Sequence, residues 1–369
     1  MCLALPGCSA GEPSEASRAA TRLVDHLAAR RGAEVEAVAR LAFAGPGDGW
    51  RASSLAVERG QGLTVFGFGQ LEAGGRTQTP RDVLWLRIGD GEAFSVGSDA
   101  DSHRAPRGGD LEVAVRPPGV RWQDCRGTFP TELAGLAAAG TRPDLEVVIA
   151  TWRAPLDDGL VALADREPVA DALADWRGKP SLPSGFQSLC HLRDARVFHR
   201  FREAGRVGIR GLATGVAGIV KKPVDVPLGA DTELSFEWRY DTLPALGPED
   251  DARHHDYSSI ALEFDNGQDL TWMGSGHLAA ETAFRCPLRW WDQRETHLVI
   301  DSGSEGLGEW RRHRRNVTAD YLHAVGGELP GRVVGVWFIS VGAFGGGTAD
   351  ATWANVVIRS HGTVTEVFD

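Results

Sequence analysis

The chain has 369 residues, 42% of them hydrophobic and 24% charged, which is typical of a globular protein of about two domains. Its 39 basic and 50 acidic side chains give a net charge of −11. That balance argues against a nucleic-acid or anionic-membrane partner, because both require a basic face. No apolar run approaches the roughly 18 residues of a membrane-spanning helix.

The number and spacing of the cysteines indicate which cellular compartment to expect. They are odd in number and form no C-x-x-C pair, so neither a disulfide framework nor a structural zinc site is expected. The first residues, MCLALPGCSAGEP, have no basic region and only a short apolar stretch, which does not favour a signal peptide. We therefore expect a cytoplasmic protein with reduced thiols; the sequence leaves its oligomeric state open.

A helical segment opens the chain. Apolar residues at helical spacing predict a helix over 12–42, begun by Pro13 and Ser14 and split at Gly32 before a second turn that reaches Leu41. The pattern then changes to short β-type runs separated by Gly, Pro and Asp, which are typical of an antiparallel sandwich. These runs are 63–72, 82–90, 110–117 and 144–152, with a helical turn expected at 131–140.

A helical linker is expected in the middle of the chain. Residues 160–176 have helical spacing, and Pro168 should break or kink the helix. Residues 178–185 contain two prolines and two glycines and predict a domain boundary.

The second half is again rich in predicted strands, which suit two packed sheets as in a jelly roll. They are 206–213, 218–226, 233–241, 258–265, 269–274, 296–301, 333–341 and 351–358, with one helix near 314–327.

The predicted fold class is all-β, with two β-sandwich domains of the jelly-roll or galactose-binding-like kind. We expect a helical N-terminal segment (1–44), a first sandwich (45–155), a helical linker (156–190) and a jelly-roll-like sandwich (191–369).

The first sandwich resembles the galactose-binding bacterial lectin fold. The resemblance rests on Trp50 and on the runs L-W-L-R-I-G (84–89), G-D-L-E-V-A-V (109–115) and W-Q-D-C-R-G (122–127). It implies a loop calcium ion that bridges protein and sugar hydroxyls. The loop here offers only Asp124 as an acidic oxygen donor, whereas calcium takes six to eight oxygens. Calcium is therefore the one possible cofactor, and otherwise none is expected.

The second half resembles a bacterial domain family of unknown function. The resembling runs are L-S-F-E-W-R-Y (234–240), R-R-N-V-x-x-D-Y (314–321) and A-x-W-A-N-V-V-I (351–358). This resemblance implies a β-sandwich. For Arg315 and Asp320 a structural role is the leading interpretation, although at a spacing of five residues they are not ideal partners.

The densest polar cluster is E-D-D-A-R-H-H-D-Y (249–257). On a strand, His255 and Tyr257 share one face, with His254 and Asp256 on the other. His255 and Tyr257 are therefore the candidate catalytic base and acid. The alternative is a solvated charged loop.

A second candidate site lies on the predicted strand 233–241. Glu237 and Arg239 alternate with aromatic residues, so one face is aromatic and the other charged. The charged face either meets solvent or uses Glu237 and Arg239 to bind or polarise a substrate. Glu263, on a strand expected to be adjacent, offers a second carboxylate of the kind that glycosidases pair across a groove.

The 12 tryptophans supply candidate ligand-stacking groups, because exposed indoles stack on sugar faces or polyketide rings. Trp238, Trp337 and Trp353 fall on predicted strands and are expected in the core. The alternative for every indole is packing. The candidates for substrate binding are Trp272, Trp290, Trp291 and Trp310.

The sequence contains no Walker A loop, no dinucleotide fingerprint in a β-α-β context and no G-x-S-x-G elbow. Three functions remain open. The first is a cofactor-independent lyase, cyclase or hydrolase acting on a glycoside-like or polyketide-like molecule. The others are a non-catalytic carbohydrate-binding protein and a structural or interaction protein.

Overall fold

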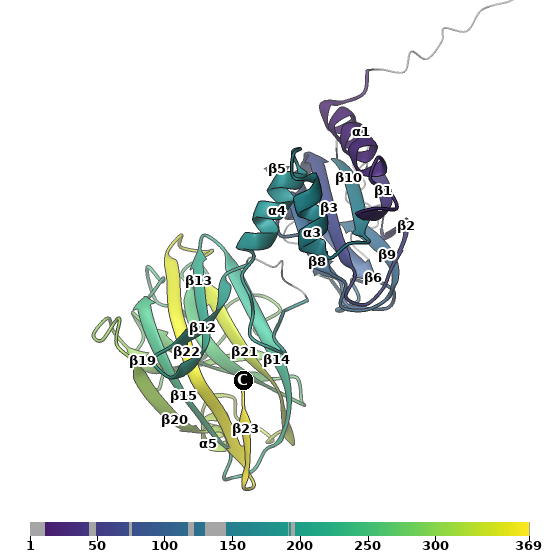
Figure 1. The fold of residues 1–369 in the computed structure, drawn as a ribbon. Helices are drawn as coiled ribbons and strands as arrows, with labels where there is room; N and C mark the ends of the chain where they lie inside the picture. Colours follow the sequence, from purple (N-terminus) through teal and green to yellow (C-terminus); the bar gives the residue numbers. More distant parts are fainter. Residues whose placement is uncertain are drawn as a thin grey trace, which may run out of the picture. The chain divides into compact units, whose positions relative to one another are not determined.

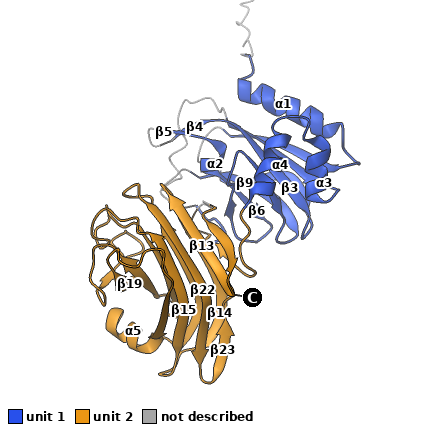
Figure 2. Ribbon diagram, turned by 60° about the vertical axis from the view of Figure 1, so that its left-hand side comes forward, with its two compact units in different colours: residues 1–179 blue, residues 180–369 orange. Residues whose placement is uncertain are grey.

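The computed structural model describes residues 12–43, 49–73, 76–116, 122–129, 145–190, 192 and 196–368. The chain forms two compact units, residues 1–179 and 180–369 (Figure 2). Most of the ordered elements in both are strands (Figure 1). Within the described residues, no helix is both long and apolar enough to span a membrane.

The first unit contains four helices and ten strands among its described residues. The helices are α1 (Glu15–Ala28), α2 (Pro80–Val83), α3 (Leu156–Leu163) and α4 (Val169–Gly178). The strands are β1 (Val35–Phe43), β2 (Arg51–Val57), β3 (Gly62–Gly69), β4 (Leu71–Ala73), β5 (Arg76–Gln78), β6 (Leu84–Ile88), β7 (Phe94–Ser95), β8 (Ala100–Arg104), β9 (Gly109–Val115) and β10 (Leu145–Trp152).

Two antiparallel sheets form the sandwich of this unit, in the orders β1-β10-β3-β8 and β2-β9-β6-β7, and β4 and β5 form a separate hairpin. One core lies between the sheets and includes Phe43, Val65 and Leu86. A second core lies where α1, α3 and α4 contribute Leu23, Leu160 and other residues against strand residues such as Phe66. The helices are therefore a packed layer of the unit.

The N-terminal helix is shorter than the sequence predicts. Ser14 caps it by accepting a hydrogen bond from the backbone N–H of Ser17, as expected, but the helix ends at Ala28. The predicted second turn is wrong, since Val35–Phe43 forms β1 and pairs along β10. Every residue of β10 is buried, so pairing with this central strand outweighs the helical spacing of the β1 apolar residues.

The sequence singles out two loops of this unit. The expected helical turn at 131–140 lies outside the described residues. The Asp124 carboxylate accepts hydrogen bonds from the Thr128 backbone N–H (3.1 Å) and hydroxyl (2.8 Å), so it stabilises the turn formed by residues 124–128.

The cysteines differ from the expectation of reduced thiols. Cys125 and Cys190 are both disulfide-bonded, and Cys286 is free.

The second unit contains one helix, α5 (Val317–Ala324), and thirteen strands among its described residues. The strands are β11 (Gln187–Ser188), β12 (Phe198–Glu203), β13 (Arg206–Thr214), β14 (Ala217–Pro227), β15 (Glu233–Thr242), β16 (Tyr257–Phe264), β17 (Asp269–Ser275), β18 (Ala283–Arg285), β19 (Glu295–Ser302), β20 (Arg311–Asn316), β21 (Arg332–Val341), β22 (Thr348–Ser360) and β23 (Thr363–Glu366).

These strands form two packed sheets. One has the order β11-β14-β21-β16-β17-β19-β18, and the other has the order β12-β13-β22-β15-β20 with β23 paired to β22. The core between them contains Trp238, Trp272, Phe338 and Trp353. This architecture is the β-sandwich that the sequence predicts.

A third layer covers the outer face of the seven-stranded sheet. Strands β17 and β19 are parallel, so the chain must cross over between them. This crossover, residues 276–294, is called the covering segment below. Its middle part is β18, which pairs with β19 at the edge of the same sheet. Leu278, Phe284 and Trp291 of the covering segment pack against outward-facing side chains of the sheet such as Trp337 and Val299. The crossover therefore buries part of the outer face of this sheet.

Candidate ligand-binding sites

Strand β15 presents a charged face to the outside of the second unit. Phe236, Trp238 and Tyr240 point inward and are buried, whereas Arg239 and Asp241 lie on the other side, half-buried and ion-paired at 3.0 Å. The alternation of aromatic and charged residues predicts this division, because successive side chains on a strand point to opposite faces.

Glu237 is the centre of an ion-pair network on that face. Its carboxylate accepts hydrogen bonds from Arg206 on β13 (2.7 Å), Arg312 on β20 (2.8 Å) and Asn355 on β22 (3.4 Å). Burial raises the pKa of Glu237, but these hydrogen bonds lower it overall, so the carboxylate stays ionised at neutral pH.

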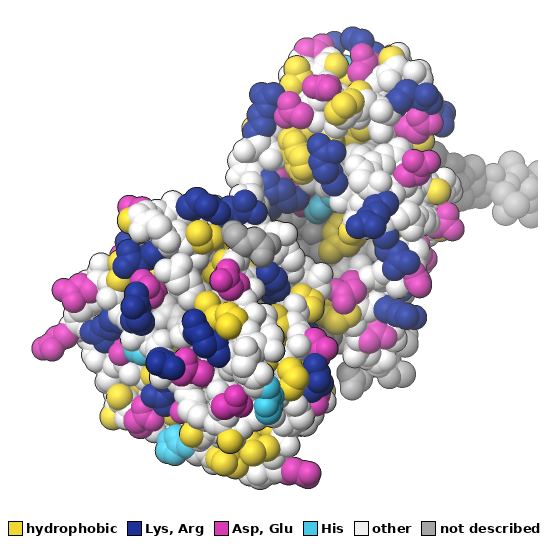
Figure 3. Space-filling model, turned by 60° about the horizontal axis from the view of Figure 1, so that its bottom comes forward, with side chains coloured by type: hydrophobic (Ala, Val, Ile, Leu, Met, Phe, Trp, Pro, Cys, Tyr) yellow, Lys and Arg dark blue, Asp and Glu magenta, His cyan; other side chains and the backbone are white. Residues whose placement is uncertain are grey.

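An open groove of about 560 Å³ runs over this network and is called the Glu237 groove below. Besides Glu237 its polar lining comes from β15, β20 and β22: Glu233, Ser235, Arg312, Arg314, Asn355 and Arg359. On the face in view in Figure 3, basic and acidic side chains are likewise interspersed.

Aromatic side chains continue the same surface beside the network. The rings of Trp310 and Phe201 are 5.6 Å apart, and both are half-buried. The Arg206 guanidinium lies 4.5 Å from the centre of the Trp310 ring, and that of Arg239 lies 5.5 Å from it. The structure thus brings together three candidates from the sequence, Glu237, Arg239 and Trp310.

Glu263 does not join them. It lies on β16, whose neighbours in the sheet are β17 and β21, so the expectation that its strand is adjacent to β15 is wrong. The chain between β15 and β16 crosses from one sheet to the other. Glu263 pairs instead with Lys221 and with Arg294 (3.3 Å), and it accepts a hydrogen bond from the Trp337 indole.

The other candidate tryptophans are dispersed. Trp272 is fully buried in the core and donates its indole N–H to Asp320 (2.7 Å), so the expectation of a ligand-facing ring is wrong. Trp290 is 58% exposed on the covering segment. Trp291 is half-buried against Trp337, with ring centres 6.3 Å apart. Trp238, Trp337 and Trp353 are buried, as expected.

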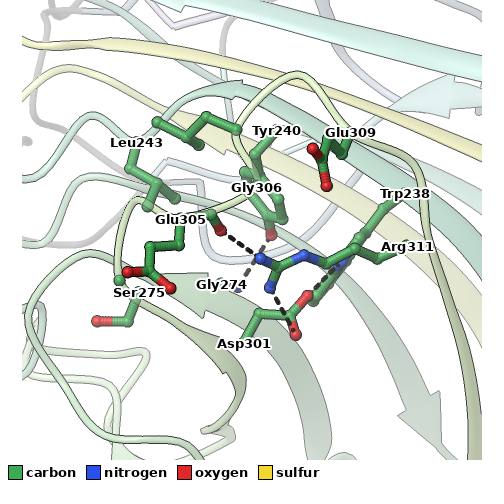
Figure 4. A pocket seen from close by; sticks show the side chains of 12 residues that line it. Trp238, Tyr240, Leu243, Gly274, Ser275, Asp301, Glu305, Gly306, Glu309 and Arg311 are labelled. Atoms are coloured by element: carbon green, nitrogen blue, oxygen red, sulfur yellow. Dashed lines mark hydrogen bonds and ion pairs between the residues drawn. The ribbon is translucent and has the colours of Figure 1, made fainter.

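A small, partly open pocket lies near Trp238 and Tyr240 (Figure 4). Its volume of about 20 Å³ holds about one water molecule. Asp301 lies in its wall, accepts a hydrogen bond from the Trp238 indole (2.8 Å) and pairs with Arg311 (3.1 Å). The pocket is too small for a sugar or a polyketide.

The run R-N-V-x-x-D-Y has a structural role. Arg315 lies on β20, next to its last residue, rather than on the helix, so it reaches Asp320 with two hydrogen bonds of 2.8 and 2.7 Å. The expectation that they are poor partners is therefore wrong. Asn316 caps α5 by accepting a hydrogen bond from the Ala319 N–H, and the Tyr321 hydroxyl accepts one from Asn266.

His255 and Tyr257 lie side by side, with ring centres 4.7 Å apart, as strand alternation predicts. Both are buried beneath the covering segment, at 0% and 4% exposure. Burial lowers the pKa of His255 to about 4 and raises that of Tyr257. A catalytic acid or base must lie within hydrogen-bond distance of the substrate proton that it transfers. Both rings are buried, so a substrate does not reach them in this structure, and their catalytic role remains a prediction.

Three more polar side chains, which sequence reasoning missed, join this buried pair. They are Cys286 of the covering segment and Glu295 and His297 of β19. Burial raises the pKa of Glu295 to about 7, and the neighbouring Asp269 adds to that rise. One ligand atom each from His255, Cys286 and His297 lies within 4.8 Å of the others. The only sequence signal was the E-x-H alternation at 295–297, which places two polar side chains on one face of a strand.

Comparison with solved structures returns sugar-associated β proteins of low similarity. A xyloglucanase domain from Sinorhizobium fredii is 10% identical over 50% of this chain and 100% of its own, with a TM-score of 0.28. A family 11 carbohydrate-binding module from Clostridium thermocellum is 10% identical over 50% of this chain and 94% of its own (TM-score 0.25). A tandem CBM22 domain from Paenibacillus barcinonensis is 11% identical over 89% of this chain and 99% of its own (TM-score 0.26).

These TM-scores are too low to indicate which ligand the chain binds. No curated protein matches the sequence. Residues 191–357, which are less than half of the chain, match the family described as "Protein of unknown function (DUF3047)".

Proposed function

We propose that the second unit is a non-catalytic carbohydrate-binding module that holds a glycan in the Glu237 groove. The observation that carries the proposal is the continuity of the ion-pair network around Glu237 with the Trp310 and Phe201 rings on one open sheet face. Arg206 joins the two parts, since it bonds to Glu237 and lies over Trp310.

The polar part of the groove suits vicinal hydroxyl groups. Each hydroxyl both donates and accepts a hydrogen bond, so it requires donors and acceptors held close together. Arg312 has five N–H donors, its side chain is 80% exposed, and one of its nitrogens is occupied by Glu237. The exposed Asn355 lies beside it. The network therefore offers oriented polar groups whose positions are fixed before a ligand arrives, which lowers the entropic cost of binding.

The aromatic part suits the apolar C–H face of a sugar ring. Trp310 is held in place by Phe201 on β12 and by the guanidinium of Arg206. A rigid aromatic ring next to a few oriented polar groups is the usual composition of a small-molecule site.

Binding is favoured over hydrolysis because the groove lacks a suitable pair of acids. Glu233 and Glu237 both line it, but four residues of strand separate their Cα atoms by about 13 Å. Glycosidases place their two carboxyl groups about 5–5.5 Å or 6.5–9.5 Å apart. Glu237 is also held by three hydrogen-bond donors, which keep its carboxylate charged rather than available as an acid.

The test is a glycan array followed by calorimetric titration of the best ligands, with neutral and uronic-acid polysaccharides both represented. Trp310→Ala and Glu237→Gln should each weaken binding about tenfold or more, which corresponds to the loss of one central contact of about 1.4 kcal/mol or more.

The matched control is Trp290→Ala. It removes an indole that is more exposed than Trp310 but belongs to the covering segment, on the other sheet. This variant should bind as the wild type does. Absence of any glycan ligand, or equal loss in Trp290→Ala and Trp310→Ala, would overturn the proposal.

A further inference from the structure

The buried cluster beneath the covering segment has the composition of a metal site. His255 lies just before β16, Cys286 on the covering segment, and Glu295 and His297 on β19. Their exposed fractions are 0%, 1%, 3% and 0%. Four polar side chains from three segments thus meet in an otherwise apolar layer, where burial of polar groups without partners is costly.

The hydrogen bond of His255 fixes which ring nitrogen is free. Its Nδ1 lies 2.6 Å from the backbone carbonyl oxygen of Glu249, which can only accept, so Nδ1 carries the proton. The lone pair is then on Nε2, which faces the Cys286 Sγ at 3.3 Å. Histidines that bind metals almost always donate their second ring nitrogen to a carbonyl or carboxylate in this way.

His297 gives an independent indication of a ligand. Both of its ring nitrogens are buried and have no hydrogen-bond partner. A buried imidazole without a partner is unfavourable, because at least one nitrogen loses the hydrogen bond it made to water. Nε2 lies 3.6 Å from the Glu295 carboxylate, and the ring stacks on Phe284 with centres 4.8 Å apart. A cation between these side chains would satisfy the free nitrogen.

We propose that His255, Cys286, His297 and Glu295 bind one Zn²⁺ ion. Zinc–nitrogen, zinc–oxygen and zinc–sulfur bonds of about 2.0–2.3 Å in a tetrahedron place neighbouring ligand atoms of this set about 3.3–3.7 Å apart. The two separations above, 3.3 Å and 3.6 Å, are close to this range. Two imidazoles, one thiolate and one carboxylate are ligand types that zinc prefers.

The charges also balance. Zinc binding requires Cys286 to release its thiol proton to solvent, and the thiolate with the Glu295 carboxylate then neutralises the two positive charges. The Glu295 carboxylate is held by the hydroxyls of Tyr257 (3.1 Å) and Thr271 (3.3 Å). Supporting hydrogen bonds of this kind orient ligands in established zinc sites. Tyr257 is thus a positioning residue of the site.

The site would fasten the covering segment to the sheet. Cys286 is the ligand from the covering segment, whereas Glu295 and His297 belong to β19 and His255 to the start of β16. With no open coordination position, the ion would be structural rather than catalytic.

The test uses the full-length, untagged protein after dialysis against a chelator. Titration with ZnCl₂ should show one ion per chain, and metal analysis of protein purified without chelator should show zinc. Co²⁺ in place of zinc should give the strong near-ultraviolet absorption of cobalt–thiolate bonding. Cys286→Ser should abolish that band, and His297→Ala should lower zinc affinity at least tenfold.

The matched control is His199→Ala, which removes an exposed histidine on β12, in the other sheet. It should bind zinc as the wild type does. Folding of each variant is checked by circular dichroism. If a variant fails to fold, the cobalt spectrum of the wild-type protein still tests the proposal. A wild-type spectrum without the cobalt–thiolate band would overturn it. Loss of glycan binding leaves this result unaffected, because the groove belongs to the other sheet.

Discussion

Asp320 holds two partners at once, which explains why Trp272 is not a ligand-facing ring. Its carboxylate accepts the indole N–H of Trp272 (2.7 Å) and two hydrogen bonds from Arg315. Asp320 is 7% exposed, and Trp272 is fully buried. The run R-N-V-x-x-D-Y therefore ties α5 to the core and to β20.

Asp320→Ala should lower the free energy of unfolding by about 3 kcal/mol, because it leaves the buried Trp272 indole N–H without an acceptor and the half-buried Arg315 guanidinium with Glu281 alone. Urea unfolding followed by tryptophan fluorescence measures the change. Asp320→Asn keeps an acceptor for Trp272 and should cost less. Equal losses in the two variants would contradict the role given to the hydrogen bond between Trp272 and Asp320.

The pH dependence of stability should show the contribution of Asp301. Burial raises its pKa, but the hydrogen bonds from His313 and Trp238, together with the nearby charge of Arg311, lower it overall. Since the pKa is lower in the folded state, the stabilisation is present above the unfolded pKa of about 3.9 and is lost as the pH falls through the folded value.

The expected result is a stability difference between wild type and Asp301→Asn that is constant near pH 5.5 and narrows below about pH 4. Unfolding curves in urea at a series of pH values measure it. A difference that widens in acid would show that the pKa is raised instead.

At the scale of elements, the apolar pattern of the sequence predicted the interior strands of the second unit but missed the charged strands at the edges of the sheet. All eight strands expected in the second half are present, because each alternates or runs apolar against the core. Strands β12 and β20, with the sequences FHRFRE and RRHRRN, carry little apolar signal. They lie at the two ends of their sheet, where charged residues are common.

Local patterns also predicted only part of the candidate sites. Strand alternation was sufficient to place Glu237 and Arg239 on one face, and the structure adds Trp310 to them. The sheet order that separates Glu263 from them is a long-range property that no local pattern contains. The meeting of Cys286 with His297 likewise depends on the crossover between β17 and β19.

The close contact between β13 and β22 depends on Gly208. A Cβ atom at this position would lie 1.9 Å from the carbonyl oxygen of Trp353, which belongs to the backbone and cannot turn away. Gly208→Ala should therefore destabilise the second unit by about 2 kcal/mol or more. Thermal unfolding measures the effect. Gly276→Ala, whose Cβ would meet only Leu243 at 3.9 Å, is the control and should change stability little.

At the scale of the whole molecule, each unit has a core of its own. Residues 180–369 should therefore fold alone, with Cys190→Ser included because Cys190 is disulfide-bonded in the full chain. We expect a β-rich circular dichroism spectrum and one cooperative unfolding transition. A fragment that shows neither would mean that its core is incomplete without residues 1–179.

The proposed function places a sugar on an open sheet face of the second unit. A crystal structure of the protein with an oligosaccharide chosen from the glycan array tests it most directly. We expect a sugar ring in the Glu237 groove, within hydrogen-bond distance of Arg312 or Asn355 and in contact with Trp310. A sugar bound elsewhere, with the Glu237 groove free of ligand, would contradict it.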